Sequence, residues 1–566
     1  MIRRMLHRST LAALAVALCG LVASPSAGAT TLFTLTGHGW GHGIGMSQYG
    51  ALGFAQRGYN WKQIIKHYYT GVTIDSLPGG TQMRVLLLSG KRSISVSFAS
   101  AATGRDEGGK VKRRLPAGIY RLEPGTTAGN LRLWSAATGR FVWQGIEGSF
   151  MLSAGSAPLR LDERAINGYT NDHWAGDFRI VRHGTTLDLI NHVGMERYVR
   201  GVVPCEVPAT WEKAAVRAQA VAARTYAVAT RKSGEFDAYP DTRSQVYCPI
   251  EQQAAASDDA VTATKRQVVK HNGSIATTFF SSSSGGRTSS IQASWGSTDQ
   301  PYLVPVPDPY DSANGLNPNH DWSPKLYTPE ALTAQLGVSG LIKRMDHNID
   351  SPSKRVLSLV LHRAEGPTQL SAGTVFSRLG LRSTFFRILQ TSLVAPAEAV
   401  AGSTFTLQGR LLPKPTGAFR LEQRVGKGGD WTEVKTPTLD EDGFFAIPRR
   451  SNKNIAYRLI RKHAFSPVEK IGVYPNLTLE TPPGGGFRGT MVRPVLAGSE
   501  VLLVRNLGSG WEIRDSAVVG PAGGYSFSVP VTKGTWKAHF AGDDDHSKGN
   551  SPYLEVTAPA RPLPPE

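Results

Sequence analysis

The alternation of apolar and polar residues divides the chain into a mixed region followed by a region of short strands. From residue 30 to about residue 203, short alternating runs predict mainly β-strands. Within that span, the apolar run Tyr198–Val203 also predicts a strand. An alanine-rich stretch then predicts a buried helix from Trp211 to about Lys232, with Thr210 as its N-cap. After about residue 390, strands at regular spacing predict all-β modules.

The same patterns give a prediction for the domain organisation. We expect an α+β, mostly β fold in which a mixed domain precedes two immunoglobulin-like β-sandwiches. A glycine-dense segment opens the mixed domain, and Met46–Gln56 and Trp61–Tyr69 within it predict two short helices. The expected boundaries are a signal peptide at 1–29, the mixed domain at 30–389, sandwiches at 390–474 and 475–558, and a disordered tail at 559–566.

Composition and the N-terminus narrow the class of partner. The chain of 566 residues has 63 Lys and Arg against 44 Asp and Glu, and the net charge of +19 favours anionic partners. The N-terminus has basic residues, an apolar run from Leu11 to Ala23 and an A-x-A signal ending at Ala29, as a secretory signal peptide does. Export argues against nucleic acid as the partner. Because no later segment is long and apolar enough to span a bilayer, we expect a secreted, soluble protein without a transmembrane anchor.

Glu206 is the first candidate for chemistry. It lies between Pro204 and Pro208, which predict a rigid turn at the start of the buried helix. A lone glutamate is more often a surface charge, but a semi-buried site would raise its pKa and make it a general acid near neutral pH. Buried polar side chains need partners, so the helix residues Gln219 and Arg224 are also informative. They lie about 140° apart around the helix, so one of them could instead be a structural strut.

The mature chain has two cysteines, Cys205 beside the candidate acid and Cys248. In an oxidising compartment they form a candidate disulfide, and the alternative is a pair of buried free thiols. We predict the disulfide, which would tie the Glu206 turn to the segment of Tyr247. Two cysteines without nearby histidines make a poor zinc site, and His38 and His42 lie among glycines that rule out a helical metal pair. We expect no metal and no cofactor.

Several motifs together resemble the SpoIID/LytB family of bacterial wall proteins. They cover roughly Thr31–Leu389 and read ERYVRGVVPCEVPATWEKAAVRAQAVAARTYAV, DTRSQVY, FFSSSSGGRT with Trp295, PYLVPVPD, LGLRST, GHGIGMSQYGA and IIKHYYTG. In the family, the GHGxGMSQxGA block normally follows the LGLRS strand, whereas here it opens the mature chain. The resemblance therefore implies a circular permutation in which 31–74 completes the domain, which is tolerable because domain termini often lie close together.

The resemblance also implies roles for individual residues. Enzymes of this family are similar to lytic transglycosylases, which cleave the bond between N-acetylmuramic acid and N-acetylglucosamine without water. Glu206 would be the acid and base. The residues implied to bind substrate or to orient Glu206 are Gln219, Arg224, Tyr247, Ser283, Gly285, Tyr302, His42 and Gln48.

Three hypotheses stay open at this point. The first is a secreted lytic transglycosylase acting on peptidoglycan glycan strands stripped of stem peptides. The second is a non-catalytic glycan-binding protein that enhances an amidase, since family relatives include amidase enhancers. The third is a hydrolase that pairs Glu206 with Asp237, Asp241 or Glu251 as a second carboxylate. Under either of the first two hypotheses, the positive charge and the sandwiches suit association with the wall and its anionic polymers.

Overall fold

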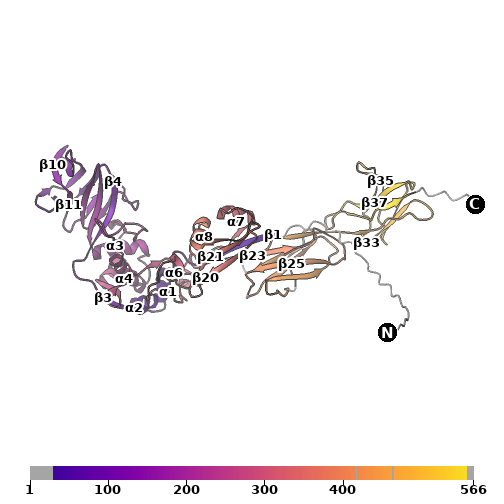
Figure 1. Ribbon diagram of the computed structural model, residues 1–566, viewed down its shortest axis with the longest axis horizontal. Coiled ribbons are helices and arrows are strands. Elements are labelled where there is room, and N and C mark those ends of the chain that lie inside the picture. Colours follow the sequence, from indigo (N-terminus) through magenta and orange to yellow (C-terminus); the bar gives the residue numbers. More distant parts are fainter. Residues whose placement is uncertain (1–29, 416, 435, 462–463, 558–566) are drawn as a thin grey trace, which may run out of the picture. The chain divides into compact units, whose positions relative to one another are not determined.

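The computed structural model describes residues 30–415, 417–434, 436–461 and 464–557 (Figure 1). The predicted signal peptide at 1–29 and the predicted tail at 559–566 lie outside the described residues. The chain divides into two units, one made of 1–34, 326–329 and 389–566 and the other of 35–325 and 330–388. The second unit holds the candidate chemistry and is called the cleft unit below.

The β-rich part of the cleft unit consists of two six-stranded sheets that enclose one large apolar core. The first has the order β10-β9-β8-β5-β12-β13, formed by Arg140–Glu147, Asn130–Ser135, Gly118–Pro124, Ile94–Phe98, Leu159–Leu161 and Asp172–Trp174. The second has the order β4-β15-β14-β11-β6-β7, formed by Gln82–Lys91, Thr186–Gly194, Asp177–His183, Ser149–Ser153, Ala102–Arg105 and Lys112–Leu115. The expectation of a mainly β region before residue 195 is confirmed.

The helical part of the cleft unit is built around one long buried helix, α4 (Lys213–Ala229). Its alanines lack bulk and therefore allow close packing against the helices around it. The helices that pack on it are α1 (Gln48–Ala55), α2 (Trp61–Tyr68), α3 (Met195–Glu206) and α5 (Ala255–Ala263). In Figure 1 the β-rich part, marked by β4, β10 and β11, lies on one side of α3 and α4.

One prediction was wrong: Tyr198–Val203 is not a strand but the middle of α3. Its buried residues include two adjacent pairs, Tyr198–Val199 and Val202–Val203. The second pair lies four residues, about one helical turn, after the first. The β-branched side chains favoured a strand, but burial of one helical stripe against the core decided the outcome. Glu206 is accordingly the last residue of α3, with Pro204 in the final turn, rather than part of a free turn.

Other helix boundaries differ by a few residues from those expected. The long helix begins at Lys213 with Glu212, not Thr210, at the N-cap, and it ends at Ala229. The first short helix begins at Gln48, because Met46–Ser47 instead forms β2, which pairs in parallel with β18 (Phe280–Ser281). The pairing draws the N-terminal segment into the cleft unit, against residues more than 200 positions later.

The remaining elements of the cleft unit are short. Two three-stranded sheets contain β3 (Thr73–Ser76), β16 (Gln267–His271) and β17 (Ser274–Ile275), and β20 (Arg344–Ile349), β21 (Val356–His362) and β22 (Thr368–Ser371). Helices and 3-10 turns complete it: η1 (Ile250–Gln252), α6 (Ile291–Trp295), η2 (Ala313–Gly315), α7 (Pro329–Leu336) and α8 (Ala372–Leu379).

The other unit is built from strands around two separate apolar cores, one over 393–473 and one over 477–556. The first group contains β23 (Phe386–Val394), β24 (Glu398–Val400), β25 (Phe405–Leu412), β26 (Arg420–Val425), β27 (Thr432–Val434), β28 (Phe444–Arg449), β29 (Ile455–Arg461), β30 (Ala464–Phe465) and β31 (Glu469–Tyr474). β1 (Thr30–Gly37) and β19 (Lys325–Tyr327) join β23, β25 and β28 in one sheet. The second group contains β32 (Asn476–Leu477), β33 (Phe487–Arg493), β34 (Glu500–Asn506), β35 (Trp511–Val518), β36 (Gly524–Phe527), β37 (Gly534–Phe540), β38 (Gly549–Asn550) and β39 (Leu554–Val556).

Together the two units give the α+β, mostly β fold that the sequence predicts. Among the described residues, no helix combines the length and the apolar character that crossing a membrane requires.

Candidate functional site

A cleft of about 480 Å³ lies in the cleft unit, and Glu206 is at its wall. One side is aromatic, and its side chains come from segments far apart in sequence: Trp40, Tyr226, Phe279, Phe280 and Trp295. The other side is a polar loop over 242–246. Among the described residues that line the cleft, Glu206 is the one carboxylate.

The Glu206 carboxylate accepts two hydrogen bonds, one at each of its oxygens. The backbone N–H of Val246 donates to Oε1 at 3.1 Å, and Nε2 of Gln48 donates to Oε2 at 3.4 Å. Burial raises the pKa of Glu206, and these two hydrogen bonds oppose the rise because they favour the charged form. A carboxyl with a raised pKa is suited to general acid catalysis near neutral pH.

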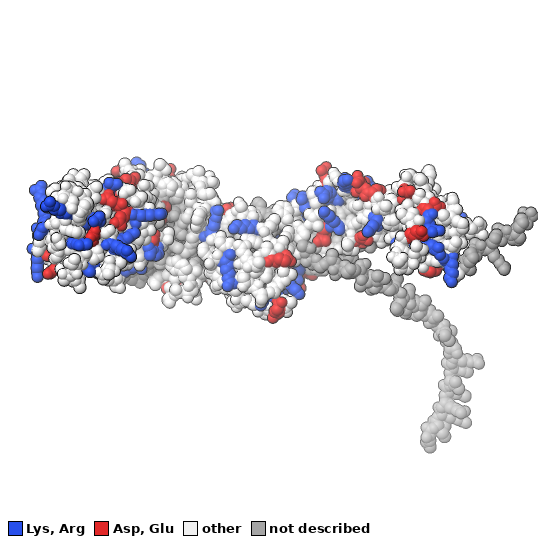
Figure 2. Space-filling view, turned by 90° about the horizontal axis from the view of Figure 1, so that it is seen from above, with Lys and Arg blue, Asp and Glu red and all other residues white. Residues whose placement is uncertain are grey.

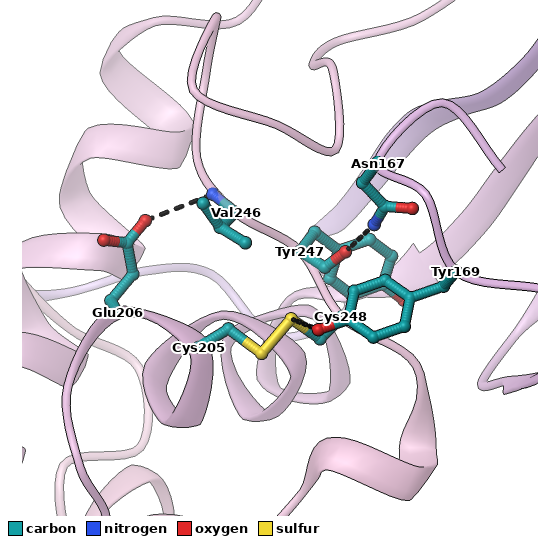
Figure 3. The surroundings of a disulfide bond; sticks show 7 residues. All are labelled: Asn167, Tyr169, Cys205, Glu206, Val246, Tyr247 and Cys248. Carbon is teal, nitrogen blue, oxygen red and sulfur yellow. Dashed lines mark hydrogen bonds between the residues drawn. A yellow bond between two sulfur atoms is a disulfide. The ribbon is translucent and has the colours of Figure 1, made fainter.

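The loop that supplies Val246 is fastened to α3 at three points, and Figure 3 shows two of them, the disulfide and the hydrogen bond from Val246 to Glu206. A disulfide joins Cys205 to Cys248, and the backbone N–H of Cys248 donates to the carbonyl of Gly201 at 3.0 Å. The Val246–Glu206 hydrogen bond is the third. The loop can approach α3 this closely because residue 201 is glycine: a Cβ there would lie 2.6 Å from the Tyr247 ring.

Gln48 reaches Glu206 because a buried polar network fixes the start of α1. Ser47 is the N-cap of α1: its Oγ accepts from the Gly50 N–H and donates to Oδ1 of Asp311 at 2.5 Å. The other oxygen of Asp311, Oδ2, accepts a hydrogen bond from Ser283 Oγ at 2.7 Å and lies 2.9 Å from Nδ1 of the His320 ring. The network therefore joins the N-terminal segment to two later loops.

A second buried aspartate, Asp308, belongs to the same network. Tyr68 and Ser284 donate to its two oxygens at 2.8 and 2.7 Å. Burial, with the nearby Asp311 charge, raises the pKa of Asp308 to about 7. Burial also opposes ionisation of Asp311, but hydrogen bonds from His320, Ser47 and Ser283 outweigh it and lower the pKa of Asp311. The pKa values of the two carboxyl groups are thus shifted in opposite directions, and Asp311 is the one that favours the charged form.

The glycine-rich N-terminal segment itself lines the cleft through Trp40, Gly41, His42 and Gln48. Its path needs glycine at Gly45, where φ is +69° and a Cβ would lie 2.2 Å from the carbonyl oxygen of Phe279. Burial, with the nearby Arg355 charge, lowers the pKa of His42 to about 4, so the imidazole is neutral at physiological pH. Its Nδ1 accepts from the Ile44 N–H at 3.0 Å, which places the ring proton on Nε2.

Three of the predicted site residues are buried supports of the cleft. The Tyr247 ring packs on Tyr198, and its hydroxyl donates to Asn191 at 2.9 Å. Arg224 is fully buried and ion-paired to Glu196 at 2.8 Å, so it is the strut of the two alternatives. Gln219 is also buried, and within the described part of the chain its amide atoms make no hydrogen bond.

The other three predicted residues lie in neighbouring polar networks rather than in the cleft lining. Ser283 and the backbone N–H of Gly285 donate to Asp311 at 2.7 and 3.0 Å. Tyr302 accepts a hydrogen bond from the Thr277 N–H at 3.0 Å. Of the predicted binding residues, His42 and Gln48 are the two that the structure brings to Glu206 in the cleft.

The candidate second carboxylates all have side-chain partners outside the cleft lining. Asp237 is buried and accepts from the Arg84 guanidinium at 2.7 Å. Asp241 pairs with Arg243 at 2.7 Å, and Glu251 pairs with His173 at 2.6 Å. None of the three lines the cleft as the structure describes it.

Sequence reasoning missed most of the aromatic wall. Trp40 and Trp295 are each about half exposed, 50% and 48%, although they line a cleft. The His42 ring packs beside one of them, since it lies 5.0 Å from the ring of Trp295. A tryptophan in a glycine-rich run can be recognised in the sequence. Which rings face Glu206 depends on the fold. Within the described residues, no group of three or more His, Cys, Asp or Glu side chains could hold a metal ion.

Comparison with known proteins finds a match to one family. Residues 183–271 match the family model described as Stage II sporulation protein, SpoIID. The matched segment contains α3, Glu206, α4 and the loop that carries Val246.

Curated relatives match over short stretches. The amidase enhancer of Bacillus subtilis strain 168 is 51% identical over 47 residues, which is 8% of this chain and 7% of that protein. The stage II sporulation protein D of Bacillus amyloliquefaciens is 56% identical over 41 residues, 7% of this chain and 12% of the relative. An uncharacterized protein of Brachyspira hyodysenteriae is 34% identical over 90 residues, 15% of this chain and 24% of the relative. The chain thus matches less than a quarter of the length of each of these relatives.

Proposed function

We propose that the cleft unit is a secreted lytic transglycosylase that acts on peptidoglycan, with Glu206 as its acid and base. The bond cleaved is the β-1,4 linkage between N-acetylmuramic acid and N-acetylglucosamine. The observation that carries the proposal is a single carboxylate with a raised pKa in an aromatic cleft, within the segment that matches the SpoIID family model.

The proposed reaction needs only one carboxylate, which acts first as the acid and then as the base. Protonated Glu206 gives its proton to the glycosidic oxygen as the bond from C1 to that oxygen breaks. The 6-hydroxyl of the same muramic residue then attacks C1, and the Glu206 carboxylate takes the hydroxyl proton. The result is a 1,6-anhydro sugar and a regenerated acid, with no water consumed.

The cleft walls favour a sugar chain as substrate. Aromatic rings such as Trp40 and Trp295 present flat apolar faces that match the C–H faces of pyranose rings. The loop over 242–246 presents Thr242 and Ser244, whose hydroxyl groups can bind sugar hydroxyls. We propose glycan strands stripped of stem peptides as the substrate.

A hydrolytic mechanism with two carboxylates is less well supported. It needs a second carboxylate beside Glu206 to activate water or to attack C1. Asp237, Asp241 and Glu251 are each held by an arginine or histidine side chain away from the cleft lining.

A second candidate function is enhancement of an amidase by glycan binding alone. The similarity of 47 residues of this chain to the Bacillus subtilis amidase enhancer favours it. The same cleft would then bind glycan without cleaving it, and an N-acetylmuramoyl-L-alanine amidase would be the partner.

One product analysis separates these functions. Purified protein is incubated with peptide-free glycan, and the products are measured by mass spectrometry. We expect 1,6-anhydro products from the wild type and from the Glu251→Gln control, and none from Glu206→Gln. Products one water heavier would support hydrolysis instead. No product from the wild type, together with faster digestion of intact wall when an amidase is added, would support the enhancer function.

A further inference from the structure

The β-rich part of the cleft unit carries basic side chains that the cleft chemistry does not use. Its edge strand β7 contains three consecutive exposed basic residues, Lys112, Arg113 and Arg114. Figure 2 shows Lys and Arg side chains over the part of the cleft unit where Figure 1 places β10 and β11.

Strand register places several of these cations in one row. Lys112 lies directly opposite Arg105 on β6, Arg105 lies opposite Met151 on β11, and Met151 lies opposite Arg179 on β14. Residues paired in this way point to the same face of the sheet, and strands lie about 4.8 Å apart, so the row spans roughly 14 Å. Arg114 lies on the same face, two residues from Lys112 along β7. We call Arg105, Lys112, Arg114 and Arg179 the basic row.

The basic row has little internal compensation. Glu107 pairs with Arg179 at 3.3 Å at one end of the row. Within the described residues, no ion pair joins Arg105, Lys112 or Arg114 to a carboxylate. Like charges directly opposite each other across two strands are destabilising, so the pair of Arg105 and Lys112 works against the stability of the free protein.

An anionic ligand would remove that repulsion. The row is open to solvent at Arg105, Lys112 and Arg114, and guanidinium groups bind phosphate oxygens in a bidentate manner. Its cations are spaced along a line rather than gathered around a point, which suits a chain of phosphates better than a single phosphate group. β7 is also an edge strand, so no neighbouring strand closes the row at that end.

We propose that the basic row binds a linear, phosphodiester-bearing polymer of the cell wall. This inference takes the wall location from the proposed function, and at the wall such a polymer is an anionic partner within reach. The row involves none of the residues that line the cleft, so binding there would hold the protein on the wall without occupying the cleft.

The test uses the full-length protein and intact wall. Wall fragments are compared before and after treatment with hydrofluoric acid, which removes phosphodiester polymers and leaves peptidoglycan. The variant is Arg105→Gln with Lys112→Gln. The matched control is Lys414→Gln with Lys548→Gln, two exposed lysines of the other unit whose replacement changes the net charge equally.

We expect the wild type and the control to bind untreated wall at least tenfold more tightly than stripped wall, with the difference largely lost in the variant. The affinity of the wild type should also fall as salt is raised, because the charges are exposed. The variant should melt no lower than the wild type, since a repulsive pair is removed, and should cleave peptide-free glycan at the wild-type rate.

Three outcomes would overturn the proposal. The first is equal binding of the wild type to stripped and untreated wall. The second is equal loss of binding in the variant and the control, which would mean that net charge alone matters. The third is binding of phosphatidylglycerol vesicles or a DNA duplex, at physiological salt, as tightly as untreated wall. Because glycan cleavage is measured separately, failure of this proposal is distinguishable from failure of the proposed function.

Discussion

Replacing Gln48 by methionine tests the electrostatics of Glu206 directly. Methionine fills a similar volume but cannot donate to Oε2 of the carboxylate, and the Val246 bond to Oε1 remains. Hydrogen bonds to charged groups contribute about 1.5–3 kcal/mol. At 3.4 Å the Gln48 bond is longer than an optimal one, so we assign it about 1 kcal/mol.

That loss translates into a shift in pKa. The charged form loses a donor, so the pKa of Glu206 should rise further, by about 0.7 units at 1.36 kcal/mol per unit. As the catalytic acid, Glu206 is active while protonated, so activity is lost as the pH rises through its pKa. The alkaline limb of the pH–rate profile should therefore move to higher pH in the variant.

Two measurements check the shift. The first is the pH dependence of kcat/KM for release of anhydro products. The second is NMR titration of the ¹³C-labelled Glu206 carboxyl, which does not depend on catalysis. Gln56→Met on the same segment is the control, because Gln56 bonds to Asn314 instead and should leave the limb unmoved. The reasoning would be refuted if, in Gln48→Met, the alkaline limb of the rate profile and the pKa of Glu206 measured by NMR were unchanged or moved to lower pH.

Three further predictions concern stability. Because burial raises the pKa of Glu206 above its unfolded value of about 4.5, its stabilising contribution is present below that value and is lost as pH rises through the folded pKa. Glu206→Gln should therefore melt higher than the wild type at pH 8, with no gain at pH 4. Replacing Cys205 and Cys248 by serine should lower the free energy of unfolding by about 4 kcal/mol, since the disulfide closes a loop with a separation of 43 residues. Arg224→Leu should cost about 3 kcal/mol in a urea titration, because it leaves Glu196 without its buried partner.

Each of these has its own check. Equal melting of Glu206→Gln and wild type at pH 8 would contradict a raised pKa. Wild-type protein unfolded in reductant should reproduce the loss seen in the double serine variant. If Arg224 is a strut, Arg224→Leu should leave the alkaline limb unchanged in whatever protein remains folded, and a displaced limb would mean that the arginine acts on Glu206 after all.

The sequence carried the local parts of the site. Alanine content and periodicity identified α4, and glycine content marked the N-terminal segment as one of sharp turns. The position of Glu206 between two prolines, next to a cysteine, singled it out among many carboxylates. Those features depend on residues within a few positions of one another, where propensity and composition are informative.

Other parts depended on packing between distant segments. Tyr198–Val203 has strand propensity, yet the core on one side and α4 on the other select a helix. Arg224 could have faced a ligand or a buried carboxylate, and the position of Glu196 decided it. Propensity differences of a few tenths of a kcal/mol per residue are smaller than the free energy of burying one helical face.

By itself the sequence singled out Glu206 as the candidate carboxylate, the two cysteines that could pair and the helix that would be buried. The tertiary structure decided what surrounds that carboxylate. Gln48 lies 158 positions from Glu206 in sequence, and its hydrogen bond exists because Ser47 and Asp311 fix the start of α1. A contact between segments this far apart is set by the packing of the whole unit, which no local pattern encodes.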